Sequence, residues 1–140
     1  PGAALTAAGC MPGDAWNRKE PVLAEAQLAA MQRDVAALIA NGQPLALFGD
    51  NVFFDLDLTA ANLPIGSRLR AGAALLEVTP KPHNGCHKFK GRFGEDALRF
   101  VAHPERRPLN LRGIYLRVVE DGVVAVGDGV AVVLRANPIL

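Results

Sequence analysis

Cysteine and serine are scarce in this chain of 140 residues, and each scarcity excludes a class of protein. The two cysteines, Cys10 and Cys86, are too few for a disulfide framework, so the sequence predicts a reduced, cytoplasmic protein. The one serine, Ser67, lies in a turn-like stretch, which argues against a serine hydrolase. The phosphate-loop, Gly-x-Ser-x-Gly and His-Glu-x-x-His motifs are missing as well, which excludes the enzyme classes built on them.

Long apolar runs and a secretory signal are also missing from the sequence. No run approaches the roughly 18 apolar residues that span a bilayer, so we expect no membrane partner. Half of the residues are hydrophobic and 21% are charged, which is typical of a globular chain. The length predicts one domain, which we place at residues 23–140, after an N-terminal arm or loop at residues 1–22.

The net charge of +1 is too small to indicate a nucleic-acid partner, but the charge is unevenly distributed. Between Lys81 and Arg117 there are nine basic and three acidic residues, together with all three histidines. Such an excess of positive charge could attract an anion. A solvated surface with extra lysines and arginines is the alternative interpretation.

Hydrophobic periodicity predicts one long helix early in the chain. From Leu23 to Ala40 the larger apolar residues fall on one helical stripe, and Asn41-Gly42 is a typical stop signal. That stripe consists of Leu28, Met31, Val35, Leu38 and Ile39.

The rest of the chain is predicted to be mostly β. Alternation or short apolar runs predict strands at residues 52–58, 68–71, 73–79, 113–120, 123–126 and 130–134, and residues 96–103 favour a short helix. Asp121-Gly122 predicts a hairpin between two of these strands, and residues 80–94 read as an irregular loop with at most one helical turn. The predicted fold class is therefore mostly β with one or two helices (α+β), as a small, closed or partly closed β-barrel.

Chemistry-bearing residues concentrate around Cys86. His83 and His87 lie within three positions of it, and Lys81, Lys88 and Lys90 lie in the same stretch. Positive charge and a helix N-terminus both lower a thiol pKa, so a helical turn starting at Cys86 would favour a reactive thiolate. A small buried thiol without chemistry is the ordinary alternative. A zinc site is a third interpretation, with His83, Cys86 and His87 as ligands and Cys10 as a fourth.

The order of several short motifs resembles the MOSC domain, the molybdenum cofactor sulfurase C-terminal domain. The motifs run from Leu63-Pro64-Ile65-Gly66-Ser67-Arg68-Leu69 through Leu75-Leu76-Glu77-Val78-Thr79, Cys86-His87-Lys88-Phe89 and Leu111-Arg112-Gly113-Ile114-Tyr115-Leu116-Arg117-Val118 to Gly122-Val123-Val124-Ala125-Val126-Gly127-Asp128. The resemblance covers residues 49–133 and implies a small β-barrel that handles a molybdenum–pterin cofactor or a sulfur carried on cysteine.

The resemblance also implies roles for individual residues. Cys86 matches the motif cysteine that serves as molybdenum ligand or sulfur carrier, and is the candidate catalytic and metal-binding residue. Arg112, Lys88, His83 and Asn51 are the candidate cofactor-binding residues, Asn51 through a similarity of Gly49-Asp50-Asn51 to the family's Gly-Glu-Asn. A soft thiolate suits molybdenum or a persulfide, and arginine suits the cofactor's anionic phosphate.

Two features depart from the family pattern. Trp16 stands where many members have a histidine, and His83-Asn84-Gly85 replaces the usual arginine and proline before the cysteine. The sequence also lacks a pyridoxal-phosphate sulfurase domain, so a sulfurase or an electron-donor protein is an expected partner.

These observations lead to two predictions of function. The first is a stand-alone MOSC domain that binds the cofactor or carries sulfur, as part of a reductase or of a sulfur-transfer system. The second is a non-enzymatic binding or interaction module that keeps the barrel and has lost the chemistry.

Overall fold

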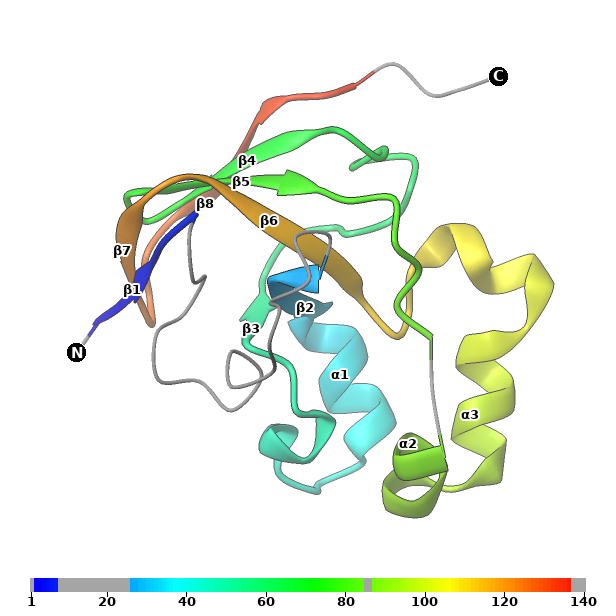
Figure 1. The fold of residues 1–140 in the computed structure, drawn as a ribbon. Helices are drawn as coiled ribbons and strands as arrows, with labels where there is room; N and C mark the ends of the chain where they lie inside the picture. The colour runs from blue at the N-terminus through cyan, green and yellow to red at the C-terminus, as the bar shows by residue number, and fades with distance from the viewer. Residues whose placement is uncertain (1, 8–25, 85–86, 137–140) are drawn as a thin grey trace.

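A strongly bent β-sheet organises the molecule, with the helices gathered at one end (Figure 1). The computed structural model describes residues 2–7, 26–84 and 87–136. Within them the strands are β1 (Gly2–Leu5), β2 (Leu28–Gln32), β3 (Val52–Phe54), β4 (Arg68–Ala71), β5 (Ala74–Val78), β6 (Ile114–Glu120), β7 (Gly122–Ala125) and β8 (Val130–Leu134). The helices are α1 (Arg33–Ala40), α2 (His87–Phe93) and α3 (Glu95–Ala102), with 3-10 turns η3 (Leu45–Phe48) and η4 (Pro104–Leu109).

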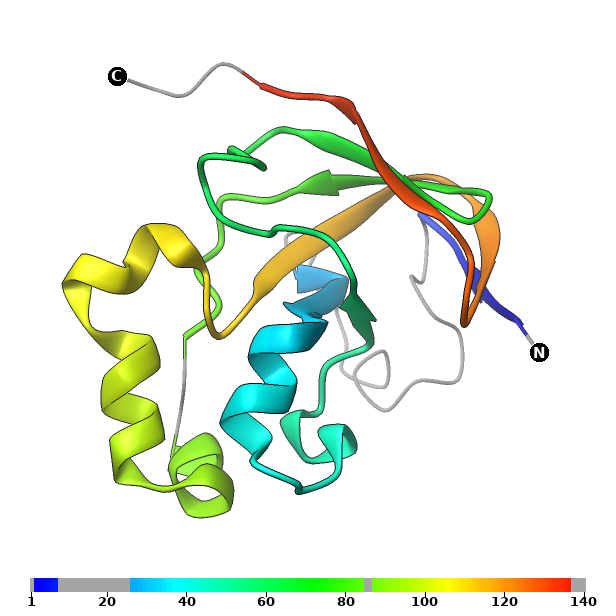
Figure 2. The same ribbon diagram turned by 180° about the vertical axis from the view of Figure 1, so that it is seen from behind.

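Six strands form one curled sheet in the order β3-β2-β6-β5-β4-β8, and β1 pairs with β7 in a separate small sheet. All neighbours in the large sheet are antiparallel except β2 and β3, which are parallel. The sheet curls around its own apolar face as a half-barrel (Figure 2). The predicted fold class, mostly β and partly barrel-like, is therefore confirmed, with three α-helices among the described residues instead of one or two.

The two strands predicted at residues 68–71 and 73–79 form a hairpin that turns at Gly72. Gly72 has φ +53°, a conformation that glycine adopts without steric strain, and this allows β4 to reverse directly into β5. Alternation then turns Leu69 and its partner Leu76 to the same interior face, where both are fully buried. Buried apolar side chains from every strand of the large sheet except β8 fill the interior of the curl, and Val130 and Val132 of β8 pack against it partly buried.

The predicted hairpin at Asp121-Gly122 is wrong, because β7 does not pair with β6. Both lateral positions beside β6 are already taken by β2 and β5, so the chain bends at Gly122 and pairs with β1 instead. A Cβ on Gly122 would lie 2.3 Å from the carbonyl carbon of Ala73, so the bend brings the two backbones together at a site where only glycine fits. Asp121 accepts a hydrogen bond from the Ala7 N–H at 2.7 Å, which ties the end of β1 to this corner.

The long helix predicted for residues 23–40 is correct only in its second half. Residues 28–32 form β2, between β3 and β6, and the described helix begins at Arg33. Leu28, Ala30 and Met31 are fully buried in the sheet, and this tertiary burial outweighs the local preference of alanine for helix. The predicted stop is confirmed, since Asn41 adopts the left-handed conformation and its N–H reaches the Ala37 carbonyl. Leu38, expected on the buried stripe, is 74% exposed.

Three other predictions change in detail. Residues 2–5 form a strand where a loop or arm was expected, because they pair with β7. The strand predicted at 52–58 ends at Phe54, although Leu58 is still buried. Asp57 then accepts the Thr59 N–H, and the hydrogen bonds from the Thr59 side chain and backbone lower the pKa of the Asp57 carboxyl. Residues 87–93 form a complete short helix rather than a single turn.

A second apolar cluster lies outside the curl and fixes the helices. Phe48 from η3 stacks on Phe93 of α2 with ring centroids 4.2 Å apart, and Phe89 lies against both rings. Met31 and Ala36 complete the buried side toward β2 and α1. None of the described helices is long and apolar enough to cross a membrane.

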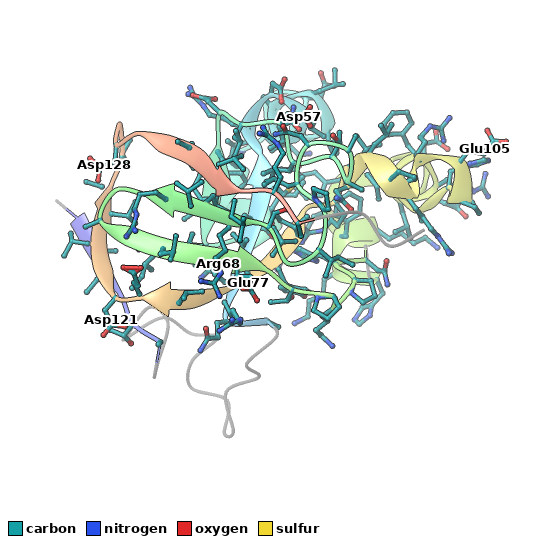
Figure 3. All side chains as sticks on the ribbon, turned by 90° about the horizontal axis from the view of Figure 1, so that it is seen from above. Asp57, Arg68, Glu77, Glu105, Asp121 and Asp128 are labelled. Carbon is teal, nitrogen blue, oxygen red and sulfur yellow. The ribbon has the colours of Figure 1, made fainter. Side chains whose placement is uncertain are left out.

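One charged row crosses three neighbouring strands on the outside of the sheet, and Figure 3 shows Arg68 and Glu77 lying together there. Glu77 on β5 bonds to Arg68 on β4 and to Arg117 on β6, both at 2.9 Å. Burial raises the pKa of Glu77, but the hydrogen bonds from the two arginines outweigh it, so the pKa lies below its ordinary value.

Candidate functional site

A cavity of about 260 Å³ opens between the segment after β5 and the segment before β6. We call it cavity 1. It is lined by Pro82, His83, Asn84, Val101, Ala102, Arg107, Asn110, Leu111, Arg112 and Gly113. The two arginines and two asparagine amides give this cavity several hydrogen-bond donors, so its chemistry suits an anion or another strong acceptor.

A second hollow of about 200 Å³, cavity 2, lies against the same segments. It is lined by Ala60, Leu63, Ile65, Val78, Thr79, Pro80, Lys81, Pro82, His83, Asn110, Gly113 and Ile114. Four residues, Pro82, His83, Asn110 and Gly113, line both cavities. The two hollows are therefore neighbours with a common wall, one mostly polar and the other mostly apolar.

Arg112, which lines cavity 1, belongs to a buried ion pair. Arg112 Nη1 is 2.9 Å from Asp50 Oδ1, and Arg112 Nη2 donates to the Phe48 carbonyl at 3.1 Å. The side chains are 11% and 2% exposed, respectively. The guanidinium carbon also lies 5.8 and 5.5 Å from the ring centroids of Phe48 and Phe89. Asp50 and two aromatic faces therefore hold the Arg112 head group in place.

His83 joins this pair from the other side. Its Nε2 lies 3.5 Å from the same Asp50 Oδ1, its side chain is 7% exposed, and its ring stacks on Tyr115 with centroids 4.4 Å apart. The contact with Asp50 is too long for a hydrogen bond. The stacking on β6 thus fixes the histidine ring beside the carboxylate and in the wall between the cavities.

Several polar atoms of this cluster are buried without a hydrogen-bond partner among the residues that the structure describes. They are Asp50 Oδ2, Arg112 Nε and both ring nitrogens of His83. Buried polar groups in folded proteins are nearly always paired, and exceptions concentrate where a ligand, water or ion completes the set. The cluster is therefore the place in the described structure where a bound group would gain most from hydrogen bonding.

Cys86, the predicted catalytic and metal-binding residue, lies outside the described residues, as does Cys10. The described chain stops at Asn84, which lines cavity 1, and resumes at His87, where α2 begins. The described residues contain no cluster of three or more metal-ligating side chains. Because both cysteines are outside this set, the zinc interpretation stays untested.

The other predicted site residues fall in three different places. His83 and Arg112 come together around Asp50, as described above. Asn51 uses its side-chain oxygen to accept the Ala29 N–H at 2.8 Å, which fastens the start of β3 to β2, and it lines neither cavity. Lys88 lies exposed on α2, also outside both lining sets. The cofactor-binding roles of all four residues remain predictions.

The structure places two residues in the site that were not among the predicted site residues. Asp50 is the acidic residue of the Gly49-Asp50-Asn51 motif and pairs with Arg112, so the motif was the signal that could have indicated it. Arg107 lines cavity 1. Arg106, its neighbour, instead lies over the exposed Phe100 ring at 4.6 Å. No sequence signal separates these two adjacent arginines.

Small-molecule sites in proteins are commonly concave hollows with apolar walls and a few polar groups, and the two cavities have this general form. Residues 14–131 match the sequence profile of the MOSC domain, so the chain belongs to the MOSC domain family. The family is a molybdenum cofactor-binding domain type, and the resemblance seen in the sequence is confirmed.

Solved structures share the fold at low identity. YiiM from Escherichia coli is 22% identical with a TM-score of 0.67, over 99% of this chain and 65% of that protein. YiiM from Geobacillus stearothermophilus is 21% identical with a TM-score of 0.61, over 79% of this chain and 55% of that protein. The YUAD protein from Bacillus subtilis is 20% identical with a TM-score of 0.52, over 74% and 62% of the two chains. This chain therefore spans less than two thirds of the length of either YiiM protein, and no curated protein matches it.

Proposed function

We propose that this domain binds a molybdenum–pterin cofactor at cavity 1, with Cys86 as the metal ligand. The observation that supports the proposal is the lining of that cavity. His83 and Asn84, which directly precede Gly85-Cys86 in the chain, face it together with Arg107 and Arg112. Cationic and amide donors beside a thiol-bearing segment match a ligand that combines anionic oxygens with a thiophilic metal.

The described residues fit the anionic part of such a cofactor. Arg112 Nε is a buried donor without a partner in the described chain, and the Arg107 guanidinium adds the planar donor pair that binds phosphate best. Asp50 neutralises part of the Arg112 charge while fixing the direction of its guanidinium. Arg107 would therefore supply attraction and Arg112 orientation. When bound, the cofactor would supply two-electron redox chemistry.

The test measures metal and pterin in protein made by cells that synthesise the cofactor. We expect close to one molybdenum per chain in the unaltered protein, loss of molybdenum in Cys86→Ser, and retention in the matched control Cys10→Ser. An unaltered protein without molybdenum, or a Cys86→Ser variant that keeps it, would contradict the proposal. Folded protein without metal is the result expected of the non-enzymatic module, and bound zinc that of the zinc-binding alternative.

A second pair of variants tests the cavity rather than the cysteine. Arg107→Met removes a charge-assisted hydrogen bond and is expected to weaken cofactor retention about tenfold or more. Arg99→Met is the matched control, because Arg99 is exposed on α3, pairs with Glu95 and lines neither cavity. Equal retention in the two variants would place the cofactor elsewhere.

A further inference from the structure

We propose that cavity 2 is a binding subsite for a small aromatic carboxylate, separate from cavity 1. This binding does not depend on the proposed cofactor. Apolar side chains, among them Leu63, Ile65, Val78 and Ile114, form most of the walls of cavity 2. Apolar walls with a few polar groups at one side are typical of small-molecule sites.

The size of cavity 2 selects a single ring. Its volume is about 200 Å³, and an apolar protein cavity of about 150 Å³ is known to hold one benzene molecule. A benzene ring with one small substituent therefore fills the space, and a fused three-ring compound exceeds it. Ile65, which belongs to this lining, is 54% exposed, so this part of the wall is accessible to solvent.

The charged and polar residues that line cavity 2 favour an anionic ligand. The residues that line it include Lys81 and His83 and no aspartate or glutamate. The nearby carboxylate, Asp50, does not line cavity 2, and its Oδ1 lies 2.9 Å from Arg112 Nη1 and 3.5 Å from His83 Nε2. The ring nitrogens of His83 have no hydrogen-bond partner in the described chain, and the side chain is more than nine-tenths buried. A carboxylate would meet the Lys81 cation, with His83 as a further polar group in the same lining.

The two cavities share the residue His83. Its side chain lines both, and stacking on Tyr115 fixes it between them. A ligand in either cavity would therefore lie against the same residue, His83.

Three probes with one ring and different charge test this subsite. Benzoate, benzamide and benzylammonium are titrated into the full, isotopically labelled chain without cofactor, and amide shifts are followed by NMR. We expect benzoate to bind with a Kd of about 1 mM, to shift the amides of Ile65, Thr79 and Ile114, and to bind more tightly than benzamide, with benzylammonium weakest. Shifts confined to Val101 and Ala102 of cavity 1, equal affinity of all three probes, or no binding would overturn the proposal.

Variants at the rim then separate charge from shape. Lys81→Met is expected to weaken benzoate binding about threefold to fivefold, and Ile65→Trp to abolish it by filling the opening. Lys90→Met, which removes an exposed lysine that lines neither cavity, should leave the affinity unchanged. Far-UV circular dichroism is the control that checks whether each variant is folded. Lys81→Met and Lys90→Met with equal affinities would refute the assigned carboxylate contact.

The subsite and the proposed function fail separately. Benzoate binding is measured on protein without cofactor, so it does not depend on molybdenum content or on Cys86. Benzoate binding in a chain that never retains molybdenum would uphold the subsite and refute the cofactor. Molybdenum retention without benzoate binding would do the reverse.

Discussion

The buried pair between Asp50 and Arg112 provides the most discriminating test of the site's construction. Arg112→Met removes the guanidinium and leaves the Asp50 carboxylate, 2% exposed, without its nearest cation at 2.9 Å. Loss of one partner of a buried ion pair costs about 3–5 kcal/mol. Asp50→Asn costs less, about 2–3 kcal/mol, because Arg112 keeps its bond to the Phe48 carbonyl and its contacts with two aromatic rings.

The double variant measures the coupling between the two side chains. The second substitution removes a group that the first has already left unpaired. The loss of unfolding free energy in the double variant should therefore be about 2 kcal/mol smaller than the sum of the two single losses. Equilibrium unfolding in urea, followed by circular dichroism, gives the three free energies of unfolding. Single effects below about 1 kcal/mol, or effects that simply add, would show that water reaches the pair and would refute its role as a buried clamp.

Three further predictions concern the fold. Glu77→Gln should lower the free energy of unfolding by about 1–2 kcal/mol at pH 7. Because the folded-state pKa of Glu77 lies below 4.5, this difference should persist above pH 4.5 and vanish as the pH falls through the folded-state pKa. Urea unfolding at several pH values measures it. Gly113→Ala should lower the free energy of unfolding by about 2–4 kcal/mol, since φ is +113° and a Cβ would lie 2.2 Å from the Ala30 carbonyl oxygen. In the control Gly91→Ala in α2, the new Cβ meets no atom within 4 Å, so this variant should be neutral or slightly stabilising. Thermal melts of the two variants measure the difference. Leu76→Ala, at a fully buried position, should lower the free energy of unfolding by about 2–5 kcal/mol, and a loss below 1 kcal/mol would mean that the curl is loosely packed.

Much of the β architecture could be predicted because its signals are local. Two short strands were predicted at residues 68–71 and 73–79, and they form as β4 and β5. The failures come from long-range pairing. Asp121-Gly122 has the composition of a tight turn, but the edges of β6 are occupied by strands distant in sequence, so the chain continues to β1. The same cause turned residues 28–32 from predicted helix into strand.

The candidate site divides in the same way. Residue type and order singled out His83 and Arg112, and the structure brings both to the Asp50 carboxylate. Asn51 was chosen on the same grounds, but its amide fastens β3 to β2. Whether a polar side chain serves a ligand or the backbone depends on which groups lie within about 3 Å of it, and that distance is set by packing rather than by sequence spacing.

The sequence alone determined the family, the mostly β class, the places of most turns and the concentration of positive charge after Lys81, because each follows from residue order and local conformational preference. The tertiary structure decided which residues of that charged stretch face a cavity, that Asp50 pairs with Arg112, and that one histidine separates a polar hollow from an apolar one. These contacts join segments more than 30 residues apart, and only the curl of the sheet brings such segments together.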